Sequence, residues 1–192
     1  MSVAAPTRPM TIEEFLALPT DDGIERMLIR GEVWEKPMTR RNRFHARLES
    51  LISHLLRSWS NSRPEPRGEV YSGEAGVRLT QAPPSVYGID VVYLSAERLA
   101  SQPDDTTLLD GPPTLAVEIL SPSDKIEEIQ AKLDEYLTAG VPVAWVVDPH
   151  FKTVTVYRPD RGPEMLHGDA VLTDQTHLPG FAVAVTELFP GE

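Results

Sequence analysis

Two stretches of the sequence are almost entirely apolar, yet each carries one carboxylate. They are Ile89–Leu94, which contains Asp90, and Thr114–Leu120, which contains Glu118. Near-continuous runs of aliphatic and β-branched residues are typical of central strands that are covered on both faces. A carboxylate in such a strand is costly to bury unless it is paired or binds a metal ion. The chain is therefore constrained to a fold that buries two central strands and gives both acids a partner.

The segment after Glu118 predicts a strand–helix–strand unit. Ser123 or Asp124 can cap a helix that runs to Ala139, and Gly140 follows where a helix C-terminus favours glycine. Apolar residues then return in the stretch 141–147. Two strands joined by a helix in this way are expected to be parallel, with a right-handed connection.

Further helices and strands are predicted around this unit. A capping-box pattern, Thr11 with Glu14, begins a short helix that ends at Leu18. The other expected elements are a hairpin of Arg26–Ile29 and Glu32–Lys36 turning at Arg30-Gly31, a long helix over Arg43–Ser60, strands over Glu69–Leu79 and Thr153–Tyr157, and a closing segment over Thr186–Phe189. Residues 101–113 are mostly polar and predict an irregular segment. The order mixes α and β elements without a linker, so we expect one α/β domain over residues 1–192, with residues 1–9 disordered.

Composition narrows the classes of function. The absence of cysteine excludes disulfides, thiolate metal sites and a cysteine nucleophile. No apolar run reaches the ~18 residues of a transmembrane helix, and residues 1–9 lack a hydrophobic signal core, so we expect a cytoplasmic protein. A net charge of −11 argues against broad, non-specific binding of nucleic acid. A homodimer is the default expectation for a soluble protein.

Asp90 and Glu118 are the first candidates for chemistry. If their strands are neighbours, both side chains reach one end of the sheet, where hard cations such as Mg²⁺ prefer oxygen ligands. The alternative is that each carboxylate accepts hydrogen bonds from nearby backbone or pairs with an arginine, and sequence position alone leaves both readings open.

Lys132 is a third candidate. It lies on the helix that follows Glu118, four residues after Glu128 and four before Tyr136, so one helix face holds all three side chains. In a catalytic role the ammonium contacts a phosphate or orients water. The alternative is an exposed ion pair between Lys132 and Glu128, which is a common outcome of this spacing.

The start of the long helix is basic. Arg40, Arg41, Arg43 and Arg47 surround His45, which titrates near neutral pH and could contact substrate or assist proton transfer. The alternatives are a solvated helix face and a structural histidine. We expect any binding of DNA to be weak at physiological salt and confined to this helix, because non-specific affinity comes mostly from phosphate neutralisation.

A set of motifs resembles the Uma-two family of restriction-endonuclease-like proteins over residues 10 to 190. The motifs follow one another in the family's order. They are Thr11–Leu18, Met27–Val33, Ile89–Val92, Val117–Ser123, Lys132, Tyr136, Ala139–Val141, Trp145–Pro149, Leu178–Gly180 and Glu187–Phe189. The resemblance implies a PD-(D/E)XK nuclease fold, in which a mixed sheet is flanked by helices.

The resemblance also implies roles for individual residues. Asp90 and Glu118 match the family's metal-binding pair, His45 matches a histidine of the first long helix, and Lys132 stands in for the lysine of the usual Glu-x-Lys motif. Some positions depart from the family pattern: Ile89 replaces proline, Leu120 the motif lysine, Met27 a glutamate and Arg30 an acidic residue. If that glutamate supports the metal site in relatives, Met27 removes one ligand or one partner of a ligand from this chain.

Together these observations predict a Mg²⁺- or Mn²⁺-dependent endonuclease that acts on DNA. The expected catalytic residues are Asp90, Glu118 and Lys132, with Asp90 and Glu118 as metal ligands. The expected substrate-binding residues are His45, Arg43, Arg47 and Tyr136. Two alternatives stay open: a catalytically impaired binding module that keeps the fold, and a phosphodiesterase that acts on a smaller substrate.

Overall fold

The protein is described by a computed structural model that covers residues 8–19, 23–37, 42–104 and 106–189. The helices are α1 (Ile12–Leu16), α2 (Arg43–Asn61), α3 (Ala96–Ala100), α4 (Ile126–Ala139) and α5 (Val185–Leu188). The strands are β1 (Ile24–Ile29), β2 (Glu32–Pro37), β3 (Glu69–Gln81), β4 (Pro84–Leu94), β5 (Leu109–Asp110), β6 (Leu115–Ile119), β7 (Val143–Asp148), β8 (Thr153–Arg158), β9 (Arg161–His167), β10 (Val171–Asp174) and β11 (Leu178–Ala184).

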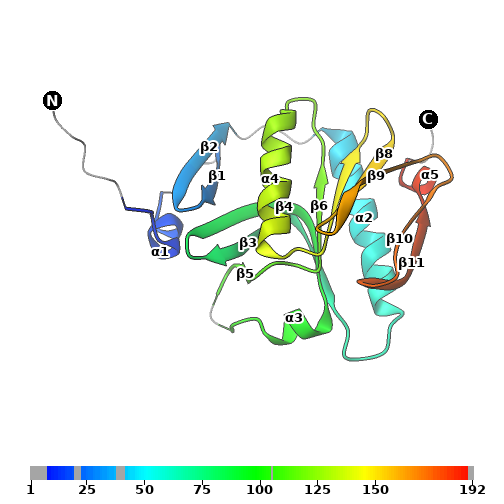
Figure 1. The fold of residues 1–192 in the computed structure, drawn as a ribbon, viewed down its shortest axis with the longest axis horizontal. Helices are drawn as coiled ribbons and strands as arrows, with labels where there is room; N and C mark the ends of the chain where they lie inside the picture. The colour runs from blue at the N-terminus through cyan, green and yellow to red at the C-terminus, as the bar shows by residue number, and fades with distance from the viewer. Residues whose placement is uncertain (1–7, 20–22, 38–41, 105, 190–192) are drawn as a thin grey trace.

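The long strand β4 organises the sheet. In the described part of the chain, the main sheet has nine strands. Seven of them have the order β2-β1-β4-β6-β7-β8-β9; in addition, β3 pairs with β4, and β5 pairs with β3. Val86 pairs with β1 and Val91 pairs with β6, while both residues also pair with β3. A strand has only two edges, so β1 and β6 share one edge of β4. The sheet therefore forks between the β1–β2 hairpin and β6 (Figure 1).

Helices cover both faces of the sheet. Alternate residues of β6 and β7 enter two separate cores, as the 2-residue period of a strand requires. Val117 and Trp145 pack in the core that contains Leu48 of α2, together with the β10–β11 sheet. Ala116 and Val146 pack in the opposite core, which contains Leu133 and Tyr136 of α4. The central strands are thus covered on both sides, as their apolar sequences predict.

Most predicted elements are confirmed. β6 and β7 are parallel neighbours joined by α4, and Gly140 ends α4 with a left-handed φ of 97°. The capping box of Thr11 and Glu14 starts α1. The β1–β2 hairpin turns at Arg30 and Gly31, whose φ values of 52° and 81° are the two positive angles of a two-residue hairpin turn.

Other expectations need correction. The helix α3 and the short strand β5 were not predicted, and α4 begins after Lys125 without a side-chain cap. Asp124 instead accepts a hydrogen bond from the backbone N–H of Ser121, at 2.7 Å, and so shapes the turn before α4. The expected disorder concerns residues 1–9, of which 1–7 lie outside the described residues. No helix in the described ranges is long and apolar enough to cross a membrane.

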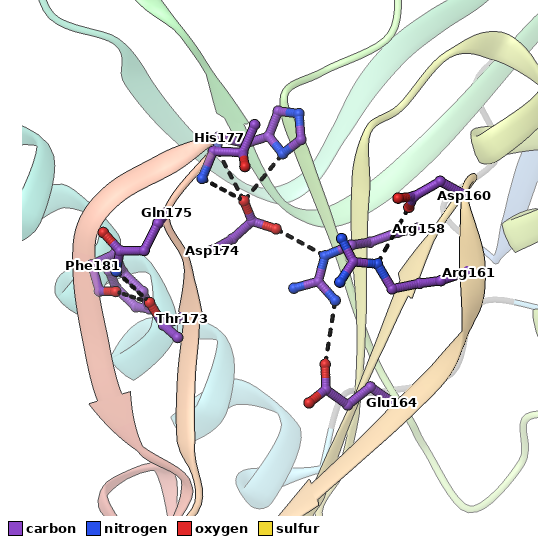
Figure 2. Close-up of polar contacts among 10 residues, drawn as sticks. Arg158, Asp160, Arg161, Glu164, Thr173, Asp174, Gln175, His177 and Phe181 are labelled. Atoms are coloured by element: carbon purple, nitrogen blue, oxygen red, sulfur yellow. Dashed lines mark hydrogen bonds and ion pairs between the residues drawn. The ribbon is translucent and has the colours of Figure 1, made fainter.

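A buried ion pair fastens the small β10–β11 sheet to the main sheet. Arg158 of β8 donates from Nε to Oδ2 of Asp174 on β10, at 2.9 Å. The other carboxylate oxygen of Asp174 accepts from the backbone N–H and from Nδ1 of His177, at 2.9 and 3.1 Å (Figure 2). Asp174 is only 6% exposed. We refer to Arg158, Asp174 and His177 as the strand clamp.

Candidate functional site

The two carboxylates singled out by the sequence lie together in the fork of the sheet. The pairing of β4 with β6 ends at Val91 and Val117. Asp90 is adjacent to Val91, Glu118 is adjacent to Val117, and both lie just beyond that last pair. Both side chains line one cleft, and their residues are only 4% and 5% exposed. The prediction that their strands are neighbours, with both carboxylates at one end of the pairing, is confirmed.

Asp90 is held by β6 and by α2. Its Oδ2 accepts a hydrogen bond from the backbone N–H of Ile119, at 2.7 Å. The same oxygen lies 3.3 Å from Nε2 of His45. His45 stands in the first turn of α2, where Asn42 caps the helix by accepting from the backbone N–H of His45. The side chain of Asp90 thus continues the link between two strands at the point where their backbone pairing stops.

Glu118 is held by α4. Lys132 Nζ donates to Glu118 Oε2 at 3.0 Å, and the hydroxyl of Tyr136 donates to Oε1 at 2.6 Å. Lys132 and Tyr136 are four residues apart, so they share one helix face. Lys132 therefore points toward the carboxylates. Glu128 pairs instead with Lys125 on the exposed side of the helix, at 2.9 Å.

Burial dominates the electrostatics of this group. It raises the pKa of Glu118, and the nearby Asp90 carboxylate adds to that rise, while Lys132 and Tyr136 oppose it. Burial alone would lower the pKa of Lys132, but Glu118 outweighs it and the pKa is raised. Burial and the Glu118 carboxylate raise the pKa of Tyr136 well above its ordinary value, so its hydroxyl stays protonated as a donor. Two acids facing one ammonium leave an excess of negative charge.

The cleft above these residues has a volume of about 640 Å³. Nine of its lining side chains are carboxylates: four from α4 and the turn before it, two from β2, and one each from β3, β4 and β6. Its three cationic side chains, Arg30, Lys36 and Lys132, each form an ion pair with a carboxylate of the protein. The described lining is therefore acidic.

Sequence reasoning missed Glu74. This residue has a φ of 59° and lies in a bulge of β3, where the pairing with β4 shifts between Ser72 and Ala75. Such bulges redirect side chains near active sites. The Glu74 side chain lies over Gly88 and lines the cleft; a Cβ on Gly88 would come within 2.8 Å of Glu74 Oε2. The sequence signal for this bulge is the presence of Gly73 and Gly88 within otherwise regular strands.

Two of the expected substrate-binding residues, His45 and Tyr136, lie behind the acid pair rather than in the cleft lining. The side chain of His45 is fully buried behind Asp90, and Tyr136 is fully buried behind Glu118. Both are therefore placed to orient a carboxylate, and contact of either side chain with a substrate stays a prediction. Packing against the sheet turns both side chains inward.

The basic stretch of α2 lies outside the cleft lining. Arg43 and Arg47 are exposed on α2, and the Arg43 guanidinium lies 4.7 Å from the centre of the Phe44 ring. Arg40 and Arg41 are outside the described residues. Binding of DNA by this stretch stays a prediction. Met27, by contrast, does line the cleft. A thioether therefore stands in the cleft lining at the position where the family pattern has a glutamate.

The residues present fit a hard divalent cation. Asp90 and Glu118 offer carboxylate oxygens, the donor type that Mg²⁺ and Mn²⁺ prefer, and a cation would offset both the burial and the Asp90 repulsion that raise the pKa of Glu118. The described ranges contain no group of three or more His, Asp or Glu side chains in metal-binding geometry. Mg²⁺ is commonly held by one or two carboxylates, with waters and substrate phosphates completing its shell.

Comparisons with known proteins identify the family and the fold of the chain. The family model of Uma2, described as "Putative restriction endonuclease", matches residues 12–186. A crystal structure of "a putative nuclease belonging to DUF820" from Anabaena variabilis ATCC 29413 superposes with a TM-score of 0.76. It is 22% identical in sequence, and the match covers 94% of this chain and 98% of that chain. At this identity the likeness shows the fold, and the predicted restriction-endonuclease-like fold is confirmed. No curated protein matches the chain.

Proposed function

The chain belongs to the Uma2 family, and from that premise we propose that it is a nuclease that uses Mg²⁺ or Mn²⁺ to hydrolyse phosphodiester bonds of DNA at Asp90 and Glu118. The observation that carries the proposal is the pair of buried carboxylates at the fork of the sheet, with the ammonium of Lys132 3.0 Å from Glu118 Oε2. A buried acid pair with a perturbed pKa in a cleft is a typical functional site.

Asp90 and Glu118 would hold the cation. Bound there, Mg²⁺ or Mn²⁺ supplies a Lewis acid for the phosphate and lowers the pKa of a water ligand. Each carboxylate oxygen has two lone pairs, so Glu118 can keep its hydrogen bonds with Lys132 and Tyr136 while it binds a cation.

The residues around the pair have separate tasks in this proposal. Tyr136 fixes Oε1 of Glu118, while His45 and the backbone N–H of Ile119 fix Oδ2 of Asp90. Lys132 keeps its proton because Glu118 raises its pKa. Its ammonium can therefore donate to an oxygen of the scissile phosphate, where negative charge grows in the transition state. His45 and Tyr136 act as positioning residues.

One observation favours a second candidate, a phosphodiesterase that acts on a smaller substrate. The nine carboxylates of the lining repel the many phosphates of a long duplex, whereas a small diester brings only one. Both candidates use the same carboxylates and the same cation, so substrate size is what separates them.

The test uses the full chain with Mg²⁺, Mn²⁺, Ca²⁺ or chelator. The substrates are supercoiled plasmid, circular single-stranded DNA and bis-p-nitrophenyl phosphate. We expect cleavage in Mg²⁺ or Mn²⁺ but not in Ca²⁺ or chelator. Glu118→Gln and Asp90→Asn should lower the rate more than about a hundredfold, because the loss of groups that merely support a metal ligand already costs 10- to 100-fold.

Glu97→Gln is the matched control, since Glu97 is an exposed acid in the first turn of α3 and outside the cleft lining. It should keep the wild-type rate. Hydrolysis of the small diester alone favours the second candidate. Cleavage that is unchanged in Glu118→Gln and Asp90→Asn contradicts both candidates.

A further inference from the structure

An exposed tryptophan stands on the wall of the candidate site. Trp34 of β2 is 54% exposed and lines the same cleft as Asp90, Glu118 and Lys132. It lies directly opposite Met27 in the β1–β2 hairpin. Opposite residues of an antiparallel pair project from the same face, so Met27 and Trp34 form one continuous apolar surface. The proposed mechanism uses neither side chain.

This surface has no structural need for an exposed indole. In the described chain β2 pairs only with β1, so Trp34 lies at the outer edge of the sheet. Met27 and Ile29 already pack against the core that includes α4, and they also line the cleft. Trp34 projects beyond them. A large indole left half-exposed beside a reactive group is available to a ligand.

The charges of the cleft indicate which part of a nucleic acid can lie there. Lys36 pairs with Glu25 at 3.1 Å, and Arg30 pairs with Glu135 at 2.5 Å. With Lys132 held by Glu118, all three cationic side chains among the described residues of the lining are engaged by carboxylates. Such a wall is poorly suited to contact a row of phosphates. A nucleobase is uncharged, and it stacks on an aromatic ring whatever its identity.

We propose that Trp34 is a stacking platform for an unpaired nucleobase next to the scissile phosphate. The substrate class is then nucleic acid whose bases are free to stack, that is, single strands or frayed ends, rather than intact duplex. The free-energy cost of unstacking is smallest for a base that is already single-stranded. This inference rests on the proposed function, because it assigns the substrate of the same site.

Three labelled oligonucleotides test the inference by fluorescence anisotropy in Ca²⁺, which supports binding without cleavage. They are a single strand, a strand of equal length in which abasic sites replace the bases, and a duplex of the same sequence. We expect the single strand to bind about tenfold to a hundredfold more tightly than the abasic strand, as expected for one base stacked on one aromatic ring. It should also bind more tightly than the duplex.

Two variants and one control identify the residue responsible. Trp34→Ala should abolish the preference for the strand that carries bases, and Trp34→Phe should keep most of it. Phe151→Ala is the control, because Phe151 is 72% exposed but lines a different cleft, between α4 and the β8–β9 hairpin. It should bind like the wild type. Thermal melts should be unchanged in Trp34→Ala, since the side chain is mostly outside the core.

The outcomes separate the two proposals. If Mg²⁺-dependent cleavage is observed but Trp34→Ala binds all three oligonucleotides like the wild type, the stacking platform is wrong and the nuclease stands. Equal binding of the abasic and base-carrying strands by the wild type also overturns the platform. If the wild type neither binds these oligonucleotides nor cleaves DNA, the platform and the DNA substrate both fail.

Discussion

The protein buries acidic side chains in two places, and the two places differ in how fully the charge is compensated. In the strand clamp, burial alone would raise the pKa of Asp174, but the backbone of His177 and the Arg158 guanidinium outweigh it and hold the pKa below its usual value (Figure 2). In the fork of the sheet, burial and Asp90 prevail and the pKa of Glu118 is raised. One carboxylate is stabilised as an anion, and the other is not.

This contrast separates an acid that holds the fold from acids that we propose bind a cation. Asp174 has one guanidinium and several N–H donors for a single carboxylate. Asp90 and Glu118 share one ammonium, and they line a cleft. Buried polar groups that are fully satisfied rigidify a core, whereas perturbed groups in clefts cluster at functional sites. The two regions should therefore respond oppositely to neutral substitutions.

The strand clamp gives the largest expected change in stability. Asp174→Asn leaves the nearly buried Arg158 with only the exposed Glu164 as an anionic partner, at 3.4 Å, and breaking a buried pair typically costs about 3 kcal/mol or more. For a chain of this size that lowers Tm by roughly 6 to 12 °C. Thermal melts measure the loss, and the rate per folded molecule should stay at the wild-type value.

The exposed neighbour of the clamp provides the control. Asp160 pairs with Arg161 at 3.4 Å, and both side chains are more than half exposed (Figure 2). Asp160→Asn should leave Tm within experimental error, because exposed ion pairs contribute little. A small effect of Asp174→Asn, equal to that of Asp160→Asn, would show that the clamp does not hold the small sheet.

Lys132→Ala should affect catalysis more than stability. We expect the cleavage rate to fall about a hundredfold, the typical loss when one transition-state donor is removed. The fold should tolerate the change, since Glu118 can take up a proton once its counter-charge is gone. Single-turnover kinetics and melts of the same preparation measure the two effects. A large fall in Tm with an unchanged rate would make Lys132 a structural partner only.

Glu118→Gln should change Tm in the opposite direction to Asp174→Asn. Neutralising one of two neighbouring buried acids removes repulsion, so in chelator Tm should be equal to or higher than that of the wild type. The gain is small, about 1 kcal/mol at most, because Lys132 loses its nearest partner. Differential scanning fluorimetry measures the change. A fall as large as that of Asp174→Asn would show that the Glu118 carboxylate is a structural acceptor.

The pH dependence of stability should also differ in sign. The raised folded-state pKa of Glu118 means that its contribution is most favourable below the unfolded value of about 4.3 and is lost as pH rises through the folded pKa. The lowered pKa of Asp174 means that its contribution is present above about 3.9 and is lost as pH falls through the folded pKa. Thermal melts in chelator at several pH values measure this. The Tm of the wild type minus that of Glu118→Gln, and the Tm of the wild type minus that of Asp174→Asn, should change with pH in opposite directions. Parallel slopes would contradict the contrast.

The acid pair could be predicted from the sequence and the clamp could not, for a physical reason. Asp90 and Glu118 interrupt apolar runs, and a single charge within such a run stands out in the sequence itself. Arg158 comes from a different element than Asp174 and His177, which are three residues apart, and all three have ordinary polar surroundings in the sequence. Only the docking of β10 beside β8 brings them together, and no local pattern encodes that contact.

The sequence also could not predict how deeply each helix side chain is buried in the site. Spacing placed Lys132 and Tyr136 on one face of α4, and the fold turns that face onto Glu118. The spacing did not reveal that Tyr136 is fully buried, or that His45 faces Asp90 rather than solvent. Which face of a helix packs on the sheet depends on the tertiary fit, and that fit sets the depth of each side chain within the site.

A crystal soaked in Mn²⁺ tests the central claim most directly, because the anomalous signal of Mn²⁺ locates the ion independently of any assay. We expect an anomalous peak in contact with the carboxylates of both Asp90 and Glu118, and its loss in crystals of Glu118→Gln. A well-soaked crystal with no peak between these two residues, or with a peak that persists unchanged in Glu118→Gln, would contradict the assignment of this acid pair as the metal site.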